Sequence, residues 1–173
     1  PEEIKAELRD YQLESLDWFA DRYDRCGGLP AILGDEMGLG KTLQTIAFLA
    51  HLKFERKLPG AFLVLCPLSV LGTWTAELAR WCPSMRVVKL HSSDEAERER
   101  LKARVLDGVG SYDVVVTTYE MAKAPSLRAP LVTSVRWRLL VLDEGHVIKN
   151  GKAKLAAACK ALRTRHRLLL SGT

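Results

Sequence analysis

The chain has 173 residues, of which 47% are hydrophobic and 27% charged, and this composition fits one soluble globular domain. Its uncharged apolar runs, such as Leu139–Leu142, are far too short to span a membrane, and no signal peptide is visible. The formal net charge of +5 favours a polyanionic partner. Because the chain begins with Pro1 and not with Met, we expect it to be a piece of a longer protein.

The four cysteines form neither a metal-binding nor a disulfide pattern. None belongs to a CxxC pair, and none has a histidine nearby at zinc-binding spacing. We therefore expect Cys26, Cys66, Cys82 and Cys159 to be free thiols in a reducing compartment.

Short apolar segments alternate with segments of helical periodicity along the chain. In chain order we expect a helix at Leu8–Tyr23, a strand at Ala31–Leu33, a helix at Lys41–Lys53, a strand at Phe62–Cys66, a helix at Val70–Arg80, a strand at Arg86–Leu90, a helix at Ser93–Leu106, strands at Tyr112–Thr117 and Trp137–Leu142, a helix at Lys152–Leu162 and a strand at Arg167–Leu170. This alternation predicts a parallel sheet covered by helices on both faces. Between these elements, Val109–Thr133 is the least regular stretch, and Pro125 and Pro130 predict a surface loop there.

The segment from Ala31 to Thr42 has the pattern of a phosphate-binding loop. An apolar run stops at Gly34, a glycine-punctuated turn follows, and Lys41 and Thr42 open a helical segment. The backbone amides of such a loop and helix start point at an anion. We expect Lys41 to reach the β- and γ-phosphates and the Thr42 hydroxyl to bind Mg²⁺. The strict pattern has glycine where this chain has Asp35, so the segment alone also fits an ordinary glycine-rich turn.

Two adjacent acids, Asp143 and Glu144, follow another apolar strand. The carboxyl ends of parallel strands share one edge of a sheet, so Asp143 is expected to project toward the site of Lys41 and Thr42. There it would hold Mg²⁺, and Glu144 would orient and deprotonate the attacking water. Taken alone, two adjacent acids at the end of a strand also fit a solvated turn. The phosphate-binding pattern elsewhere in the chain makes a metal-binding and catalytic role the better interpretation.

At this point the chain resembles the Swi/Snf group of DNA translocases, the chromatin remodellers within the superfamily-two helicase-like motors. The resemblance rests on LRDYQ at 8–12, GDEMGLGKT at 34–42, LCPLSV at 65–70 with Trp74, TTYE at 117–120, DEGH at 143–146, IKN at 148–150 and SGT at 171–173. It spans essentially the whole chain and is nearest to the imitation-switch branches. One departure is Gly145, where the family usually has Ala. Members of the family tolerate glycine at this position.

The resemblance implies an α/β fold of the P-loop NTPase type: a RecA-like three-layer sandwich forming a single lobe over residues 1–173. It also implies the functional residues. ATP would be bound by Arg9, Gln12, Asp35, Met37, Gly38, Leu39, Gly40, Lys41, Thr42, Leu43 and His146, with Gln12 reading the adenine edge. Asp143, Glu144 and Lys41 would be catalytic, Thr42 and Asp143 would hold Mg²⁺, Pro67, Ser69, Thr117 and Thr118 would contact DNA, and Ser171, Gly172 and Thr173 would couple the nucleotide state to DNA.

The same resemblance implies partners and a compartment. ATP and Mg²⁺ would be used in the nucleus on double-stranded DNA and nucleosomes, with no membrane involved. The motors of this family carry a second, C-terminal RecA-like lobe with an arginine finger, and this chain ends at Thr173 without one. Because such a finger contributes roughly 10³–10⁵ in turnover, we expect the chain alone to bind ATP weakly and to be nearly inactive.

Two other classes of protein remain as alternatives. A different P-loop enzyme is one, but a GTPase needs an NKxD guanine-reading motif, which this sequence lacks, and nothing indicates a kinase acceptor site. A non-catalytic nucleotide-binding module is the other, and the intact Lys41, Thr42, Asp143 and Glu144 argue against it. We also expect Trp74 to be a core residue and not a platform for stacking bases.

Overall fold

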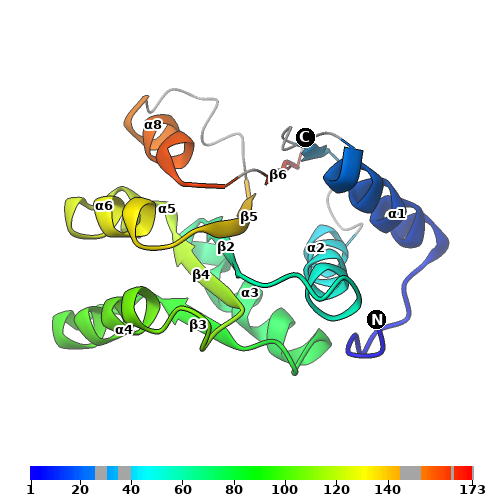
Figure 1. Ribbon diagram of the computed structural model, residues 1–173, viewed down its shortest axis with the longest axis horizontal. Helices are drawn as coiled ribbons and strands as arrows, with labels where there is room; N and C mark the ends of the chain where they lie inside the picture. Colours follow the sequence, from blue (N-terminus) through cyan, green and yellow to red (C-terminus); the bar gives the residue numbers. More distant parts are fainter. Residues whose placement is uncertain (26–30, 35–39, 145–152, 165, 173) are drawn as a thin grey trace.

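The computed structural model describes residues 1–25, 31–34, 40–144, 153–164 and 166–172 of the chain. Its centre is one sheet of six strands in the order β1-β6-β5-β2-β4-β3 (Figure 1), and every neighbouring pair is parallel. The strands are β1 (Ala31–Leu33), β2 (Ala61–Cys66), β3 (Val87–Leu90), β4 (Val114–Thr118), β5 (Trp137–Leu142) and β6 (His166–Leu170). The predicted α/β fold with a parallel sheet is therefore confirmed.

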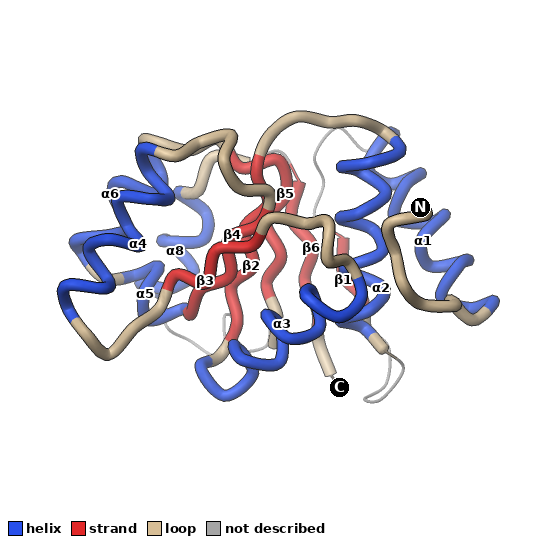
Figure 2. The backbone as a smooth tube through the Cα atoms, turned by 90° about the horizontal axis from the view of Figure 1, so that it is seen from below, coloured by secondary structure: helices blue, strands red, loops and turns tan. Residues whose placement is uncertain are grey.

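Helices connect the strands and cover both faces of the sheet. They are α1 (Asp10–Arg25), α2 (Lys41–Ala50) continued by a π-helical turn η1 (His51–Glu55), α3 (Leu68–Trp81), α4 (Glu95–Asp107), α5 (Tyr119–Lys123), α6 (Pro125–Thr133) and α8 (Ala153–Ala161). Figure 2 shows the sheet between two helical layers, with α4, α5, α6 and α8 in one layer. The other layer contains α1, α2 and α3, whose buried side chains share one hydrophobic cluster. None of the helices in the described ranges is long and apolar enough to cross a membrane.

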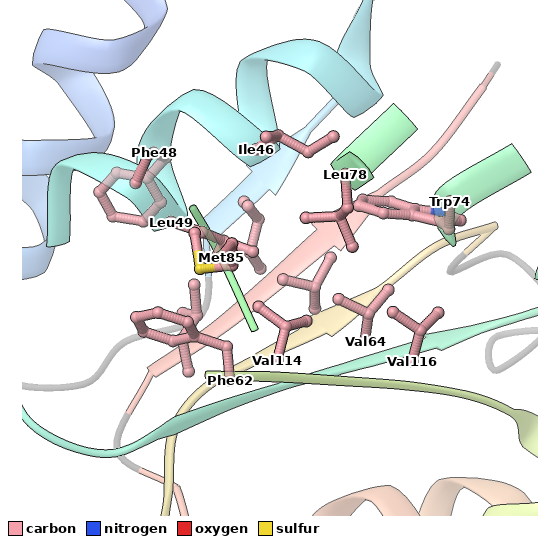
Figure 3. Packing of buried hydrophobic residues seen from close by; sticks show 14 of the residues in the cluster. Ile46, Phe48, Leu49, Phe62, Val64, Trp74, Leu78, Met85, Val114 and Val116 are labelled. Carbon is pink, nitrogen blue, oxygen red and sulfur yellow. The ribbon is translucent and has the colours of Figure 1, made fainter. Parts of the chain in front are cut away.

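The burial of the central strands explains why they appear in the sequence as short, uninterrupted apolar runs. Every residue of β2 is buried, because side chains that alternate along a strand meet a helical layer on either side. Phe62 and Val64 point into the cluster with α1, α2 and α3 (Figure 3), whereas Leu63 and Leu65 point into the cluster with α5, α6 and α8. The strand therefore carries no polar face in its sequence.

The structure overturns the expected loop at Val109–Thr133. Much of this stretch is regular: β4 is followed by the short helix α5 and by α6. Pro125 occupies the start of α6, where a missing N–H costs nothing, and Pro130 lies inside the helix. Leu127 and Leu131 are buried on one face of α6, and this tertiary packing outweighs the penalty of the internal proline.

A buried carboxylate ties η1 to the start of β3 and β4. Asp113 is 2% exposed, and its Oδ1 lies 2.8 Å from Lys53 Nζ and 2.8 Å from Arg86 Nη2. Burial opposes the ionisation of Asp113, but the hydrogen bonds from Arg86 and Lys53 outweigh it and hold its pKa at about 2. This cross-link lies in the scaffold and involves none of the predicted site residues.

Candidate nucleotide-binding site

The predicted site residues gather where the carboxyl ends of the strands meet. The register pairs Leu33 with Leu170 and Leu65 with Leu142, so β1, β6, β5 and β2 end at the same edge of the sheet. Asp143 follows β5 directly, and its backbone N–H donates to the carbonyl of Leu65 at 2.9 Å. Only β6 separates β1 from β5, so these strand ends lie ~10 Å apart at the usual strand spacing.

The first turn of α2 is prepared for an anion. Gly40 precedes the helix with the left-handed angles φ 73° and ψ 38°, and no side chain caps the helix start. Lys41 and Thr42 are its first two residues, half-buried, and the first turn contains no acid. The first N–H groups of any helix lack partners within the helix and carry partial positive charge, so a nearby anion is favourable. Leu43 lies in the same turn, whereas Asp35, Met37, Gly38 and Leu39 lie outside the described residues.

Gln12 on α1 reaches this turn. Its side chain is 5% exposed, and its Oε1 accepts the backbone N–H of Arg9 at 2.9 Å. Its Nε2 lies 2.8 Å from the position that a Cβ on Gly40 would occupy. A Cβ at this position would displace the Gln12 amide, so glycine allows Gln12 to lie against the start of α2. The predicted contact of Gln12 with adenine stays a prediction.

Asp143 accepts three hydrogen bonds, in addition to the one that its backbone N–H donates to Leu65. Its Oδ2 accepts the indole N–H of Trp74 at 2.7 Å, and its Oδ1 accepts the backbone N–H of Glu144 at 2.8 Å. Its backbone carbonyl accepts the hydroxyl of Tyr119 at 2.6 Å. Each carboxylate oxygen has a further lone pair, so both can still accept from a metal-bound water.

Glu144 has a strained backbone. Its φ of 55° is in the left-handed region, which costs an L-residue with a Cβ roughly 1–2 kcal/mol. Strain of this kind persists only where the surrounding structure holds the residue in place, and it is frequent at functional sites. Glu144 thus lies beside Asp143 just after the end of β5, where the sequence predicts the base that activates water.

Ser171 and Gly172 follow β6, which lies between β1 and β5 in the sheet. They are therefore placed between the start of α2 and Asp143. The backbone N–H of Ser171 donates to the carbonyl of Leu33 at 3.1 Å, and both residues are half-buried. This contact joins the end of β6 to the strand that leads into the phosphate-binding segment. Thr173 and His146 lie outside the described residues.

The four residues expected to contact DNA lie at the same edge but differ in exposure. Pro67 immediately precedes α3 and is half-buried, and Ser69 in its first turn is exposed. Thr117 is fully buried and its hydroxyl donates to the carbonyl of Leu90 at 2.6 Å. Thr118 is 3% exposed and caps α5, its hydroxyl oxygen accepting the N–H of Met121 at 3.2 Å. Ser69 is thus the most exposed of the four.

Sequence reasoning missed the roles of Trp74 and Tyr119. Trp74 is a core residue as expected, 1% exposed and beside Leu78 (Figure 3), but its indole N–H also holds Asp143. Tyr119 is 4% exposed; burial raises the pKa of its phenol, which keeps the hydroxyl protonated and able to donate. Nothing in the apolar pattern distinguishes these aromatics from other core residues, because the hydrogen bonds arise only when α3, α5 and β5 pack together.

This fold and this edge define a nucleotide-binding lobe of the P-loop type, and comparison with known proteins supplies its family. The family model of the SNF2-related domain matches residues 11–173. The chain therefore belongs to the SNF2-related domain family, as the motifs predict.

Several relatives are similar over nearly the whole chain. It is 44% identical over 167 residues to the human "SWI/SNF-related matrix-associated actin-dependent regulator of chromatin subfamily A member 1", and 41% identical over 172 residues to the "ISWI chromatin-remodeling complex ATPase CHR17" of Arabidopsis thaliana. These matches cover 96% and 98% of this chain but only 15% of either relative. Among solved structures, the SWI2/SNF2 ATPase core of Sulfolobus solfataricus in complex with double-stranded DNA superimposes with a TM-score of 0.83 at 37% identity, covering 99% of this chain and 33% of that one.

Proposed function

We propose that this chain is the ATP-binding lobe of an ATP-dependent motor that moves along double-stranded DNA and acts on chromatin. The observation that carries the proposal is the convergence of Gln12, the Gly40–Thr42 helix start and Asp143–Glu144 on one edge of the sheet. The family implies the use of ATP. The relatives named as chromatin regulators, and the related core solved on double-stranded DNA, support DNA in chromatin as the track and, in a eukaryotic source, the nucleus as the compartment.

In this proposal each group at the edge has one task. The amides of the first turn of α2 and the Lys41 ammonium bind the phosphates, and Gln12 orients the adenine. Thr42 and Asp143 would hold Mg²⁺, which would neutralise phosphate charge. Glu144 accepts a proton from the water that attacks the γ-phosphorus as the bond to the β-phosphate oxygen breaks and ADP leaves.

Turnover is expected to need residues beyond this chain, which spans 15% of the length of the relatives above. An arginine finger from a C-terminal RecA-like lobe contributes roughly 10³–10⁵ in rate, and we assign that task to a second lobe in the parent protein. The 173-residue chain is then a single lobe that binds ATP and Mg²⁺ and contributes one wall of the DNA site.

The nucleotide assignment is tested by titrating the chain with a fluorescent ATP analogue and Mg²⁺. Lys41→Ala should weaken binding at least about tenfold, because it removes the cation that reaches the β- and γ-phosphates. Lys89→Ala is the matched control, since Lys89 is exposed on the edge strand β3, far from the site in the strand order. Equal affinity in the wild type and in Lys41→Ala would refute the phosphate-binding assignment.

The DNA assignment is tested with duplexes of unrelated sequence at several salt concentrations. Recognition of duplex shape and phosphates should be indifferent to sequence and should weaken steeply as salt rises. Ser69→Asp should weaken duplex binding, because it adds an anion at the exposed start of α3. Nucleotide binding without duplex binding under any of these conditions would count against a DNA contact by this lobe.

A further inference from the structure

Asp143 is anchored by two aromatic side chains from different helices. The indole N–H of Trp74, on α3, donates to its carboxylate at 2.7 Å. The hydroxyl of Tyr119, the first residue of α5, donates to its backbone carbonyl at 2.6 Å. One bond therefore orients the carboxylate and the other holds the backbone that carries it.

Both aromatics lie directly after a segment that the sequence predicts to contact DNA. Ser69 is in the first turn of α3, and Trp74 lies just over one turn further along the same helix. Tyr119 is the residue after Thr118. Each predicted DNA-contacting segment is thus joined, through a short stretch of chain, to a side chain that holds the proposed magnesium acid.

We propose that Trp74 and Tyr119 are positioning residues that transmit DNA contact at these two segments to Asp143. The inference rests on the proposed function, since it presumes that Asp143 holds Mg²⁺ and that both segments meet DNA. A displacement of α3 or of the start of α5 moves the donor that it carries. That movement changes the position of the Asp143 carboxylate and so the binding of Mg²⁺ and nucleotide. DNA binding and nucleotide binding are then coupled without a movement of the whole sheet.

The surroundings make these two connections stiff. Trp74 packs in the cluster that contains Leu71, Leu78 and Val116, so its ring moves with α3 and cannot rotate independently. The Tyr119 side chain is 4% exposed and packs in the opposite cluster, so its ring is fixed as well.

The chain contains a matched control for each aromatic. Trp137 is 2% exposed, and its indole N–H donates to the carbonyl of Leu131 at 3.1 Å in the opposite cluster. Tyr112 is 2% exposed, and its hydroxyl donates to the carbonyl of Val105 at 2.6 Å. Substitution by Phe removes the same donor in each pair, but only in Trp74 and Tyr119 does the donor serve Asp143.

The experiment measures the duplex affinity of the chain with and without Mg²⁺ and a non-hydrolysable ATP analogue, and the Mg²⁺ concentration needed for nucleotide binding. In the wild type, nucleotide should change the duplex affinity severalfold, and by linkage DNA should change the nucleotide affinity by the same factor. In Trp74→Phe and in Tyr119→Phe this factor should fall toward one. In Trp74→Phe the Mg²⁺ requirement should also rise about tenfold, since a charge-assisted hydrogen bond is lost.

Trp137→Phe and Tyr112→Phe should lose comparable thermal stability but keep both the coupling and the Mg²⁺ requirement of the wild type. A general loss of packing would affect all four variants alike and would overturn the inference. Coupling that persists in Trp74→Phe and Tyr119→Phe would overturn it as well, while leaving the proposed function intact. A wild-type chain that binds neither nucleotide nor duplex would overturn both.

Discussion

The side-chain amide of Gln12 lies against Gly40, with its Nε2 2.8 Å from the place where a Cβ on that glycine would stand. Gly40 also has a φ of 73°. Two independent features therefore favour glycine at the start of α2, one from the backbone and one from the contact with α1. The glutamine motif and the phosphate-binding segment, far apart in the sequence, depend on each other through this contact.

We expect Gly40→Ala to weaken ATP binding about tenfold or more and to destabilise the fold by about 1–2 kcal/mol, since an L-residue must adopt left-handed angles and displace Gln12. Gly110→Ala separates these causes, because Gly110 has a φ of 97° but nothing within 4 Å of an added Cβ. It should lose stability and keep ATP affinity. Adding Gln12→Ala to Gly40→Ala should recover part of the stability; if it does not, the steric argument is wrong.

The stability of the protein should fall as the pH drops from about 4 toward 2, in part through Asp113. The pKa of its carboxyl is held at about 2 in the folded state, below the ordinary value of 3.8. The group therefore stabilises the fold fully above its unfolded pKa, and this contribution is lost as pH falls through the folded pKa. Chemical denaturation of the wild type and of Asp113→Asn across this pH range measures the contribution.

Asp113→Asn should reduce the free energy of unfolding by about 1–3 kcal/mol at neutral pH, because the cations of Lys53 and Arg86 lose a buried partner. The difference from the wild type should shrink toward pH 2. Asp24→Asn is the control, since Asp24 pairs with Arg56 at an exposed position, where such pairs contribute ~0–1 kcal/mol. A constant difference across the pH range would contradict the assignment to Asp113.

Removing the backbone strain at Glu144 should raise the stability of the fold but abolish ATP hydrolysis. Glu144→Gly is expected to raise the free energy of unfolding by about 0.5–1 kcal/mol, because glycine accepts left-handed angles without a Cβ clash. The same variant in a protein with both motor lobes should lose ATP hydrolysis, since the proposed base is gone. Lys57→Gly is the matched control, with a φ of 50° and an exposed side chain: it should gain similar stability and keep hydrolysis.

The buried thiols should resist alkylation in the folded protein. Cys66, Cys82 and Cys159 are free and buried, and burial raises the pKa of each, to about 12 for Cys66 and about 11 for Cys159. The thiolate that reacts with an alkylating reagent is therefore scarce at pH 8. In a Cys26→Ser variant, labelling followed by mass spectrometry should detect reaction only in denaturant. Rapid labelling of this variant without denaturant would show that the packing around these thiols is wrong.

Much of the fold could be predicted from the sequence because a parallel sheet buried on both faces leaves a local signal. Each observed strand overlaps a predicted apolar run, and for β5 the observed and predicted bounds, Trp137–Leu142, are identical. The signal failed at 125–133, where Pro125 and Pro130 indicated a loop. The side chains of Leu127 and Leu131 stabilise a helix there by packing on the opposite cluster, which no local pattern records.

The candidate site also contains residues whose roles local sequence predicts and residues whose surroundings depend on tertiary packing. Roles that follow from residue type and spacing, such as those of Lys41, Thr42 and Asp143, could be predicted along the chain, and they stay predictions. Thr117 was predicted to contact DNA, but its hydroxyl is buried and donates to the carbonyl of Leu90, a neighbour that only the β3–β4 pairing brings close. DNA contact at this position stays a prediction.

The sequence by itself determined the fold class and the family, and it predicted the residues that handle phosphate and metal, because these inferences depend on short motifs and on the period of apolar side chains. Only the tertiary structure decided how those residues are supported: Gln12 against Gly40, and Trp74 and Tyr119 on Asp143. The physical reason is that each supporting contact joins segments far apart in the chain. Its hydrogen bond or close approach exists only once the helices have packed on the sheet, so an indole or a phenol in the sequence cannot reveal which acceptor it will meet.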